Sequence, residues 1–362
     1  MNTQAQGLVC QIEGQFESRH HKASYRSLLS LFLKADGHAV LRASEAKSAS
    51  ALSRFLNHYR WCSRPLLRSM RQAALAQVWE QYPKKPGRRP TLNVIVDLTS
   101  IEKSGLFDHL PIAELDGVRG VHLVMVFLFI GELRIPWGFR VWQGKGKTTQ
   151  TQLAIKLLLS LPPSLKKCFR LRVLADGGFS SAAFLTKLHA LGFEAVTGMR
   201  KDRTLSDERK LYELKRQGEK VRLAGLDIPV WVSWFDVKRK RGKKRYFVIS
   251  LSKATPRTIR RWGKFRWRIE AFFKTMKQRF SLTRFGQATR LGVYRYLLLS
   301  FLAYLIAHLS ALPDKSSWPD WQRIAQSLRL SLFPDLILLD LSNRLEQLNP
   351  FLTQPLAIAQ KV

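Results

Sequence analysis

The stretch between residues 92 and 198 restricts the fold more than any other part of the chain, because strand and helix signals follow one another there in a defined order. Three strand-like runs come first: LNVIVDL at 92–98, VHLVMVFLFI at 121–130 and ELRIPWGFRVW at 132–142. A turn at Gly131 joins the last two and predicts a hairpin. The segment therefore begins as a strand followed by a β-hairpin.

Helices and strands alternate after this hairpin. Apolar spacing predicts a helix at 149–161, a strand at 170–175, a helix at 180–192 and a strand at 193–198. The order βββαβαβ is that of an RNase H-like mixed sheet flanked by helices. The predicted fold class is therefore α/β, with this sheet as its core.

Composition shifts around the core predict the domain divisions. The run PKKPGRRP disfavours both helix and strand and marks a linker. Helical spacing comes before it, and a mixed, strongly basic segment that resembles an antiparallel β insertion comes after residue 200. Basic residues such as Arg54, Arg64 and Arg68 stand on the polar faces of the N-terminal helices, as expected if these helices contact DNA, although a solvated face would look similar. The predicted divisions are a helical N-terminal DNA-binding domain with linker (1–90), the first part of the core (91–200), a β-rich insertion (201–251), the second part of the core (252–312) and C-terminal helices (313–362).

The chain is strongly basic. Its 61 Lys and Arg residues against 26 Asp and Glu residues give a formal charge of +35, which indicates a polyanionic partner, with nucleic acid as the first candidate. The basic residues are interleaved with aromatic ones and do not form one basic amphipathic helix, which argues against a membrane surface. The uncharged run 296–312 includes Ser300 and His308, so we expect a buried helix there and no membrane span.

The cysteines and the N-terminus predict a cytoplasmic protein. Cys10, Cys62 and Cys168 are isolated and lack the spacing of a zinc site or of a disulfide framework. The first residues lack the basic start and apolar run of a signal peptide. A reducing cytosol fits both observations.

Two aspartates follow apolar strand runs. Asp97 comes after LNVIV, and Asp176 comes after RLRVLA and before Gly177 and Gly178, which permit a tight turn. A charge at such a place requires a metal, a partner or a solvent cleft. If the two strands are neighbours, both carboxylates converge at one sheet edge and can share a divalent cation. The alternative for each residue is an aspartate that caps a helix or a turn.

A third carboxylate lies on a predicted long helix, which Thr255 can cap. Arg266, Glu270 and Lys277 lie within about 40° of one another on this helix, beside its apolar stripe. An ordinary row of surface ion pairs would look similar. The order strand Asp, strand Asp and helix Glu, with a basic insertion before the helix, raises this constellation above its separate parts.

This constellation resembles the DDE transposases of bacterial insertion sequences, in the branch with the signature Y-x2-R-x3-E-x6-K. Arg266, Glu270 and Lys277 match that spacing, while Gly263 stands at the Tyr position with Trp262 beside it. VIVDLTSIEKSG and VLADGGFSS look like the family's two Asp motifs. The resemblance covers about residues 45–310.

The resemblance implies a mechanism and partners. Asp97, Asp176 and Glu270 would be catalytic and would hold two Mg²⁺ or Mn²⁺ ions for phosphoryl transfer. The protein would cut DNA at insertion-sequence ends and join it to target DNA, in the bacterial cytoplasm at the nucleoid and as a homodimer on DNA. Arg266 and Lys277 would hold DNA phosphates, and the missing Tyr removes one contact, for which Trp262 is a possible substitute.

The predicted insertion supplies further DNA-binding candidates. In similar enzymes this region holds the DNA end, so Trp231 and Trp234 could stack on a base, although their spacing also favours core packing for at least one. The run KRKRGKKR is the first candidate for phosphate contacts, with a solvated hairpin tip as the alternative. Its basic residues are Lys238, Arg239, Lys240, Arg241, Lys243, Lys244 and Arg245.

Three other functions share some of these sequence features. Gly144–Gln150 (GKGKTTQ) lies between a strand and a helix like a phosphate-binding loop, but Val141 stands where that motif requires its first glycine, which argues against ATP binding. A non-catalytic DNA-binding protein derived from a transposase would not need the three carboxylates. A nuclease of the same fold would cut DNA without joining strands, and a strand-transfer assay would separate the two.

Overall fold

The fold comes from a computed structural model that describes residues 3–44, 46–83, 87, 89–105, 107, 109–239, 242–287, 289–312 and 319–348. The chain divides into two compact units. The first comprises Met1–Ala76, Phe107–Leu110 and Lys274–Val362, and the second comprises Gln77–Leu106 and Pro111–Phe273.

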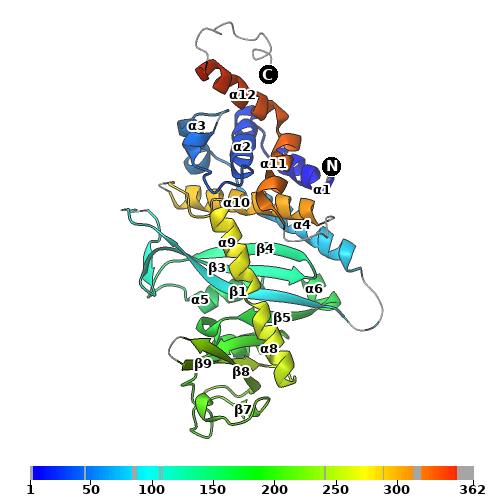
Figure 1. Ribbon diagram of the computed structural model, residues 1–362, viewed down its shortest axis with the longest axis vertical. Helices are drawn as coiled ribbons and strands as arrows, with labels where there is room; N and C mark the ends of the chain where they lie inside the picture. The colour runs from blue at the N-terminus through cyan, green and yellow to red at the C-terminus, as the bar shows by residue number, and fades with distance from the viewer. Residues whose placement is uncertain are drawn as a thin grey trace. The chain divides into compact units, whose positions relative to one another are not determined.

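The second unit is built on one mixed sheet flanked by helices (Figure 1). β1 pairs antiparallel with β3 and parallel with β5, β3 pairs antiparallel with β4, and β5 pairs parallel with β6. The order is therefore β4-β3-β1-β5-β6, and every strand predicted between residues 92 and 198 is present. The bounds are β1 (Thr91–Glu102), β3 (Val118–Ile130), β4 (Leu133–Trp142), β5 (Arg170–Ala175) and β6 (Glu194–Met199). A short β2 (Ala113–Leu115), not predicted, pairs with the start of β3.

Helices follow the strands as the apolar spacing predicted. α5 (Gln150–Leu158) packs against β3 and β4 and begins at a capping box formed by Thr149 and Gln152. α6 (Pro163–Cys168) precedes β5, and α7 (Ala182–Ala190) packs on β6. Because helices cover the sheet, β3 is buried almost throughout, which explains its unbroken apolar run.

The predicted insertion extends the core sheet. β7 (Lys220–Arg222), β8 (Pro229–Arg239) and β9 (Gly242–Ser250) are antiparallel to one another, and β9 pairs antiparallel with β6. The insertion thus continues the core sheet in the order β6-β9-β8-β7 (Figure 1). An edge strand leaves its backbone groups unpaired, and β9 satisfies those of β6.

The long helix predicted from Thr255 is broken in two. α8 (Pro256–Phe265) packs across β5, β6, β8 and β9 on the face turned toward the viewer in Figure 1, and α9 (Arg268–Gln278) follows. At the junction, the N–H groups of Arg266 and Glu270 donate to carbonyls three residues earlier, at 3.3 and 3.1 Å. This tighter i→i−3 pattern interrupts the α-helix and changes the direction in which the following side chains point.

The first unit is helical and has α10 (Arg290–Ala311) at its centre, in contact with α1, α2, α3 and α11. Within the described residues, α10 is the one helix long and apolar enough to cross a membrane, but 89% of its most apolar window is buried inside the protein. The prediction of a buried helix is confirmed. The other helices are α1 (Thr3–Glu13), α2 (Arg19–Phe32), α3 (Ala49–Asn57), α4 (Ser63–Gln81), which continues into the second unit, α11 (Trp321–Leu332) and α12 (Pro334–Leu348).

Candidate carboxylate centre and basic cleft

Strand register brings the two predicted aspartates side by side. The parallel pairing of β1 with β5 ends at Val96 and Ala175, and the next residues are Asp97, still on β1, and Asp176, directly after the end of β5. β1 itself continues to Glu102, so Asp97 marks the end of its parallel neighbour and not its own end. Since side chains alternate along a strand, matched positions on neighbouring parallel strands point to the same face.

Asp97 is held in a buried position. Its residue is 7% exposed, and its Oδ1 accepts a hydrogen bond from the N–H of Leu98 at 2.9 Å. Burial raises the pKa of its carboxyl from 3.8 to about 6; the nearby Arg266 guanidinium partly offsets this, and the negative charges of Asp176 and Glu270 add to it. Asp97 and Asp176 follow matched positions of β1 and β5, and Arg266 contacts both Asp97 and Glu270, so the three predicted carboxylates lie near one another within the second unit.

Asp176 is also the cap of the turn that follows it. Its Oδ1 accepts a hydrogen bond from the N–H of Gly178 at 2.9 Å, at the start of the 3₁₀ turn Gly177–Phe179. The alternative capping role is therefore real, and it fixes the orientation of the carboxylate. A Cβ on Gly198 would lie 3.0 Å from the backbone nitrogen of Gly177, so an alanine there would require this turn to shift by a few tenths of an ångström.

Arg266 links two of the carboxylates. Its Nη1 lies 3.0 Å from Oδ2 of Asp97, and its Nη2 lies 2.9 Å from Oε1 of Glu270. The Glu270 side chain is 59% exposed, whereas that of Arg266 is 21% exposed. The structure thus places a guanidinium between a buried and an exposed carboxylate.

The donor chemistry of this centre fits a divalent cation. Carboxylate oxygens are hard ligands, and the raised pKa of Asp97 shows that its buried charge is incompletely balanced by the surrounding protein. Within the described residues, however, no group of three or more His, Cys, Asp or Glu side chains is close enough to hold a metal ion. The Arg266 guanidinium supplies positive charge between Asp97 and Glu270.

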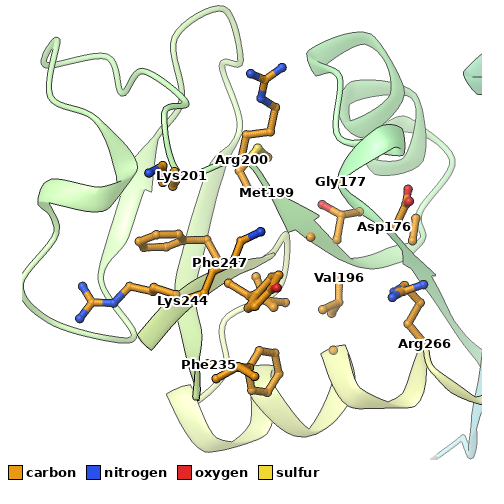
Figure 2. A pocket seen from close by; sticks show the side chains of 18 of the residues that line it. Asp176, Gly177, Val196, Met199, Arg200, Lys201, Phe235, Lys244, Phe247 and Arg266 are labelled. Atoms are coloured by element: carbon orange, nitrogen blue, oxygen red, sulfur yellow. The ribbon is translucent and has the colours of Figure 1, made fainter. Parts of the chain in front are cut away.

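A cleft of about 1180 Å³ adjoins this centre, between the end of β6, the β8–β9 hairpin and the junction of α8 and α9. Figure 2 shows Asp176 and Arg266 on one side of it and Lys201 and Lys244 on the other. Other cations and aromatic rings in its lining are Arg200, Arg245, Tyr212, Phe235, Tyr246, Phe247 and Trp267. The combination of cations and rings is suited to a nucleic-acid strand.

The predicted tryptophans of the insertion lie on β8. Trp234 is 6% exposed and packs against Phe247, with the Arg245 guanidinium 4.8 Å from its ring centroid. The ammonium of Lys220 lies 5.9 Å from the Trp231 ring. Their stacking on a base stays a prediction.

Sequence reasoning did not single out Trp267, the tryptophan in the lining of the cleft. It is 47% exposed, and its ring lies 6.2 Å from that of Phe235. Its position directly after Arg266 was the available signal.

The described residues of the basic run KRKRGKKR belong to the end of β8 and the start of β9. Lys244 and Arg245 line the cleft, and Arg245 donates a hydrogen bond to Asp236 at 3.2 Å. The other basic residues of the run lie outside the described part of the chain, either wholly or in their side chains: Lys238, Arg239, Lys240, Arg241 and Lys243.

Gly263, at the Tyr position of the signature, packs closely against the sheet. A Cβ there would lie 3.2 Å from a methyl of Val248 and 3.5 Å from the ring of Phe235, so a larger side chain would require the Val248 side chain to shift. Trp262 packs instead on Arg172, whose guanidinium lies 3.7 Å from its ring centroid. Phe235 is therefore the ring that lies against position 263 and also lines the cleft.

Lys277, the last basic residue of the signature, lies in the first unit near the end of α9. Burial lowers the pKa of its ammonium group. Its predicted contact with a DNA phosphate stays a prediction.

Together, the fold and the site define a class, that of an α/β protein with a carboxylate centre at the edge of a basic cleft, as in polynucleotidyl transferases and nucleases. The family model described as "Transposase DDE domain" matches residues 94–306, which is more than half of the chain. The chain therefore belongs to this family, whose members typically use a divalent metal.

Among solved structures, the chain is similar to the piggyBac transposase in a cryo-EM structure of its synaptic complex with hairpin DNA. The TM-score is 0.51 at 12% sequence identity, over 92% of this chain and 74% of that chain. At this identity the likeness shows the fold alone. No curated protein matches the chain.

Proposed function

We propose that this chain is a transposase of the bacterial insertion-sequence type, in the branch with the Tyr-Arg-Glu-Lys signature, that cuts DNA at the ends of its element and joins them to target DNA. The observation that carries the proposal is that the β1–β5 register brings Asp97 beside Asp176, while Arg266 contacts both Asp97 and Glu270. The strand order β4-β3-β1-β5-β6 supports an RNase H-like core.

In this proposal Asp97, Asp176 and Glu270 would hold two Mg²⁺ or Mn²⁺ ions. When bound, such ions activate the attacking oxygen and stabilise the leaving oxygen of an in-line displacement at phosphorus. The protein contributes the fixed orientation of Asp97, by the Leu98 N–H, and of Asp176, by the Gly178 N–H. Glu270, which is the most exposed of the three, can reorient from its helix.

The cleft is the proposed path of the DNA strand. Lys244, Arg245 and Arg266 lie in its lining and would contact phosphates, while Trp267 and Phe235 offer rings on which unpaired bases can stack. The net charge of +35 predicts that DNA affinity falls steeply with salt, because each neutralised phosphate releases counterions. The similar piggyBac structure is a complex with DNA, which supports DNA as the partner.

The helical first unit is proposed to bind DNA as well, through the basic helices in its N-terminal part. Two element ends must be cut together, so we infer that the active form on DNA is a homodimer. Both inferences follow the resemblance and place the protein with DNA in the bacterial cytoplasm.

The proposal is tested by Mg²⁺- or Mn²⁺-dependent cleavage and strand transfer on the terminal DNA of the element. Asp97→Asn, Asp176→Asn and Glu270→Gln should each abolish both reactions while DNA binding persists. Asp207→Asn is the matched control, because Asp207 is exposed and paired with Arg209 at 2.6 Å. It should leave both reactions intact.

Each other outcome identifies a different protein. Cleavage without joining would indicate a nuclease of the same fold. DNA binding without cleavage by the wild type would indicate a non-catalytic derivative of a transposase, and a substitution that leaves activity intact would remove that residue from the site.

A further inference from the structure

The Arg266 guanidinium uses two of its donor nitrogens on two different carboxylates. One nitrogen is 3.0 Å from Asp97 and the other 2.9 Å from Glu270, which come from a central strand and from the first turn of α9. A planar guanidinium can make such a fork with both partners, whereas a single ammonium group is a compact point charge. Arg266 therefore holds these two carboxylates together.

The same side chain faces the cleft. Arg266 lies in the cleft lining beside Trp267 and is 21% exposed, so a ligand in the cleft can reach it. It stands at the junction of α8 and α9, where the i→i−3 hydrogen bonds interrupt the regular helix. A phosphate in the cleft is a strong alternative partner, since guanidinium–phosphate pairs are charge-assisted and often bidentate.

Arg266 cannot contact both carboxylates and a phosphate in the cleft at the same time. A divalent ion bound by Asp97 and Glu270 needs the oxygens that face Arg266 and would lie against a like charge. Once the guanidinium turns to a phosphate in the cleft, both carboxylates are released, and their mutual repulsion favours an ion between them.

We propose that Arg266 couples DNA binding to metal binding. In the free protein it takes the place of a divalent ion between Asp97 and Glu270, and a DNA phosphate that enters the cleft draws it away and opens the ion site. This inference rests on the proposed function, because it takes Asp97 and Glu270 as ion ligands. It goes beyond that function by making the metal-loaded state depend on bound DNA, so that the free protein stays poorly loaded.

The test is the affinity of the full-length protein for Mn²⁺, measured by electron paramagnetic resonance of the free ion, with and without a short DNA duplex. Coupling between two ligands is reciprocal and typically amounts to about 5- to 150-fold. We expect the duplex to tighten Mn²⁺ binding by wild type about tenfold. Arg266→Gln should bind Mn²⁺ about tenfold more tightly than wild type without DNA and gain much less from the duplex.

Two further variants separate the fork from a general effect of charge. Arg266→Lys keeps the positive charge but loses the two-armed contact, so it should also bind Mn²⁺ more tightly than wild type without DNA. Arg209→Gln removes an exposed arginine that is paired with Asp207, and it should leave both affinities unchanged. If Arg266→Lys matches wild type while Arg266→Gln binds more tightly, charge alone acts and the proposal is overturned.

Failure of this inference can be distinguished from failure of the proposed function. If Asp97→Asn leaves Mn²⁺ binding of wild type unchanged, the ion ligands are wrong and both fall. If Asp97→Asn abolishes binding but Arg266→Gln binds Mn²⁺ as weakly as wild type without DNA, the ion site stands and only the coupling is refuted. A thermal unfolding curve for each variant shows that it is folded before its affinity is compared.

Discussion

Asp97→Asn is expected to stabilise the protein when divalent ions are absent. Burial raises the pKa of Asp97 from 3.8 to about 6, so the folded protein holds this proton more tightly than the unfolded chain does. The contribution of Asp97 to the free energy of unfolding is therefore most favourable below 3.8, the pKa of this carboxyl in the unfolded chain. That contribution is lost as the pH rises from 3.8 through about 6. The shift of about two units at about 1.4 kcal/mol each amounts to about 3 kcal/mol.

The neutral asparagine keeps the shape of the side chain and avoids this penalty. The variant should match wild type near pH 4 and exceed it by up to about 3 kcal/mol in free energy of unfolding at about pH 8. Arg266 loses its ion pair with residue 97 in this variant but keeps Glu270 as a partner at 2.9 Å, so its guanidinium is not left unpaired. A stabilising substitution at a residue proposed as catalytic is the expected trade between stability and function.

The assay is urea denaturation with EDTA at a series of pH values. Asp207→Asn is the control, because a hydrogen bond from Arg209 holds the pKa of this exposed carboxyl below its ordinary value, and its removal should not stabilise the protein. Adding Mn²⁺ in excess should narrow the difference at high pH, since only the carboxylate gains a ligand. A variant less stable than wild type at about pH 8, or a difference independent of pH, would refute the reasoning.

Three further substitutions have clear expected outcomes. Gly198→Ala adds a Cβ within 3.0 Å of the Gly177 backbone and should slow DNA cleavage at least about tenfold, by displacing the Asp176 turn, with the fold retained in circular dichroism. Trp267→Ala should weaken binding of single-stranded DNA by about 1–3 kcal/mol in fluorescence anisotropy, and unchanged affinity would exclude stacking on this ring. Arg295→Leu should lower the free energy of unfolding by about 3 kcal/mol, because this buried guanidinium donates to four backbone carbonyls around the end of α3. A thermal midpoint equal to that of wild type would contradict this expectation.

The sequence by itself determined the local elements and the candidate acids. The apolar runs that end beside Asp97 and Asp176 predicted β1 and β5, because a charge next to a buried strand needs a reason that is visible in the sequence alone. The order of strands and helices along residues 92–198 likewise follows from apolar periodicity, which depends on near neighbours. Charge excess indicated a polyanionic partner without any knowledge of the fold.

Only the tertiary structure decided how these elements meet. The β1–β5 register sets Asp97 beside Asp176, and the pairing of β9 with β6 turns the insertion into an extension of the core sheet. Neither follows from the sequence, because register depends on pairing between segments far apart in the chain. The break between α8 and α9 also escaped prediction, since the residues on both sides of it favour helix and only packing on the sheet selects the tighter turn at Arg266. That turn places one arginine between two carboxylates and in the lining of the cleft.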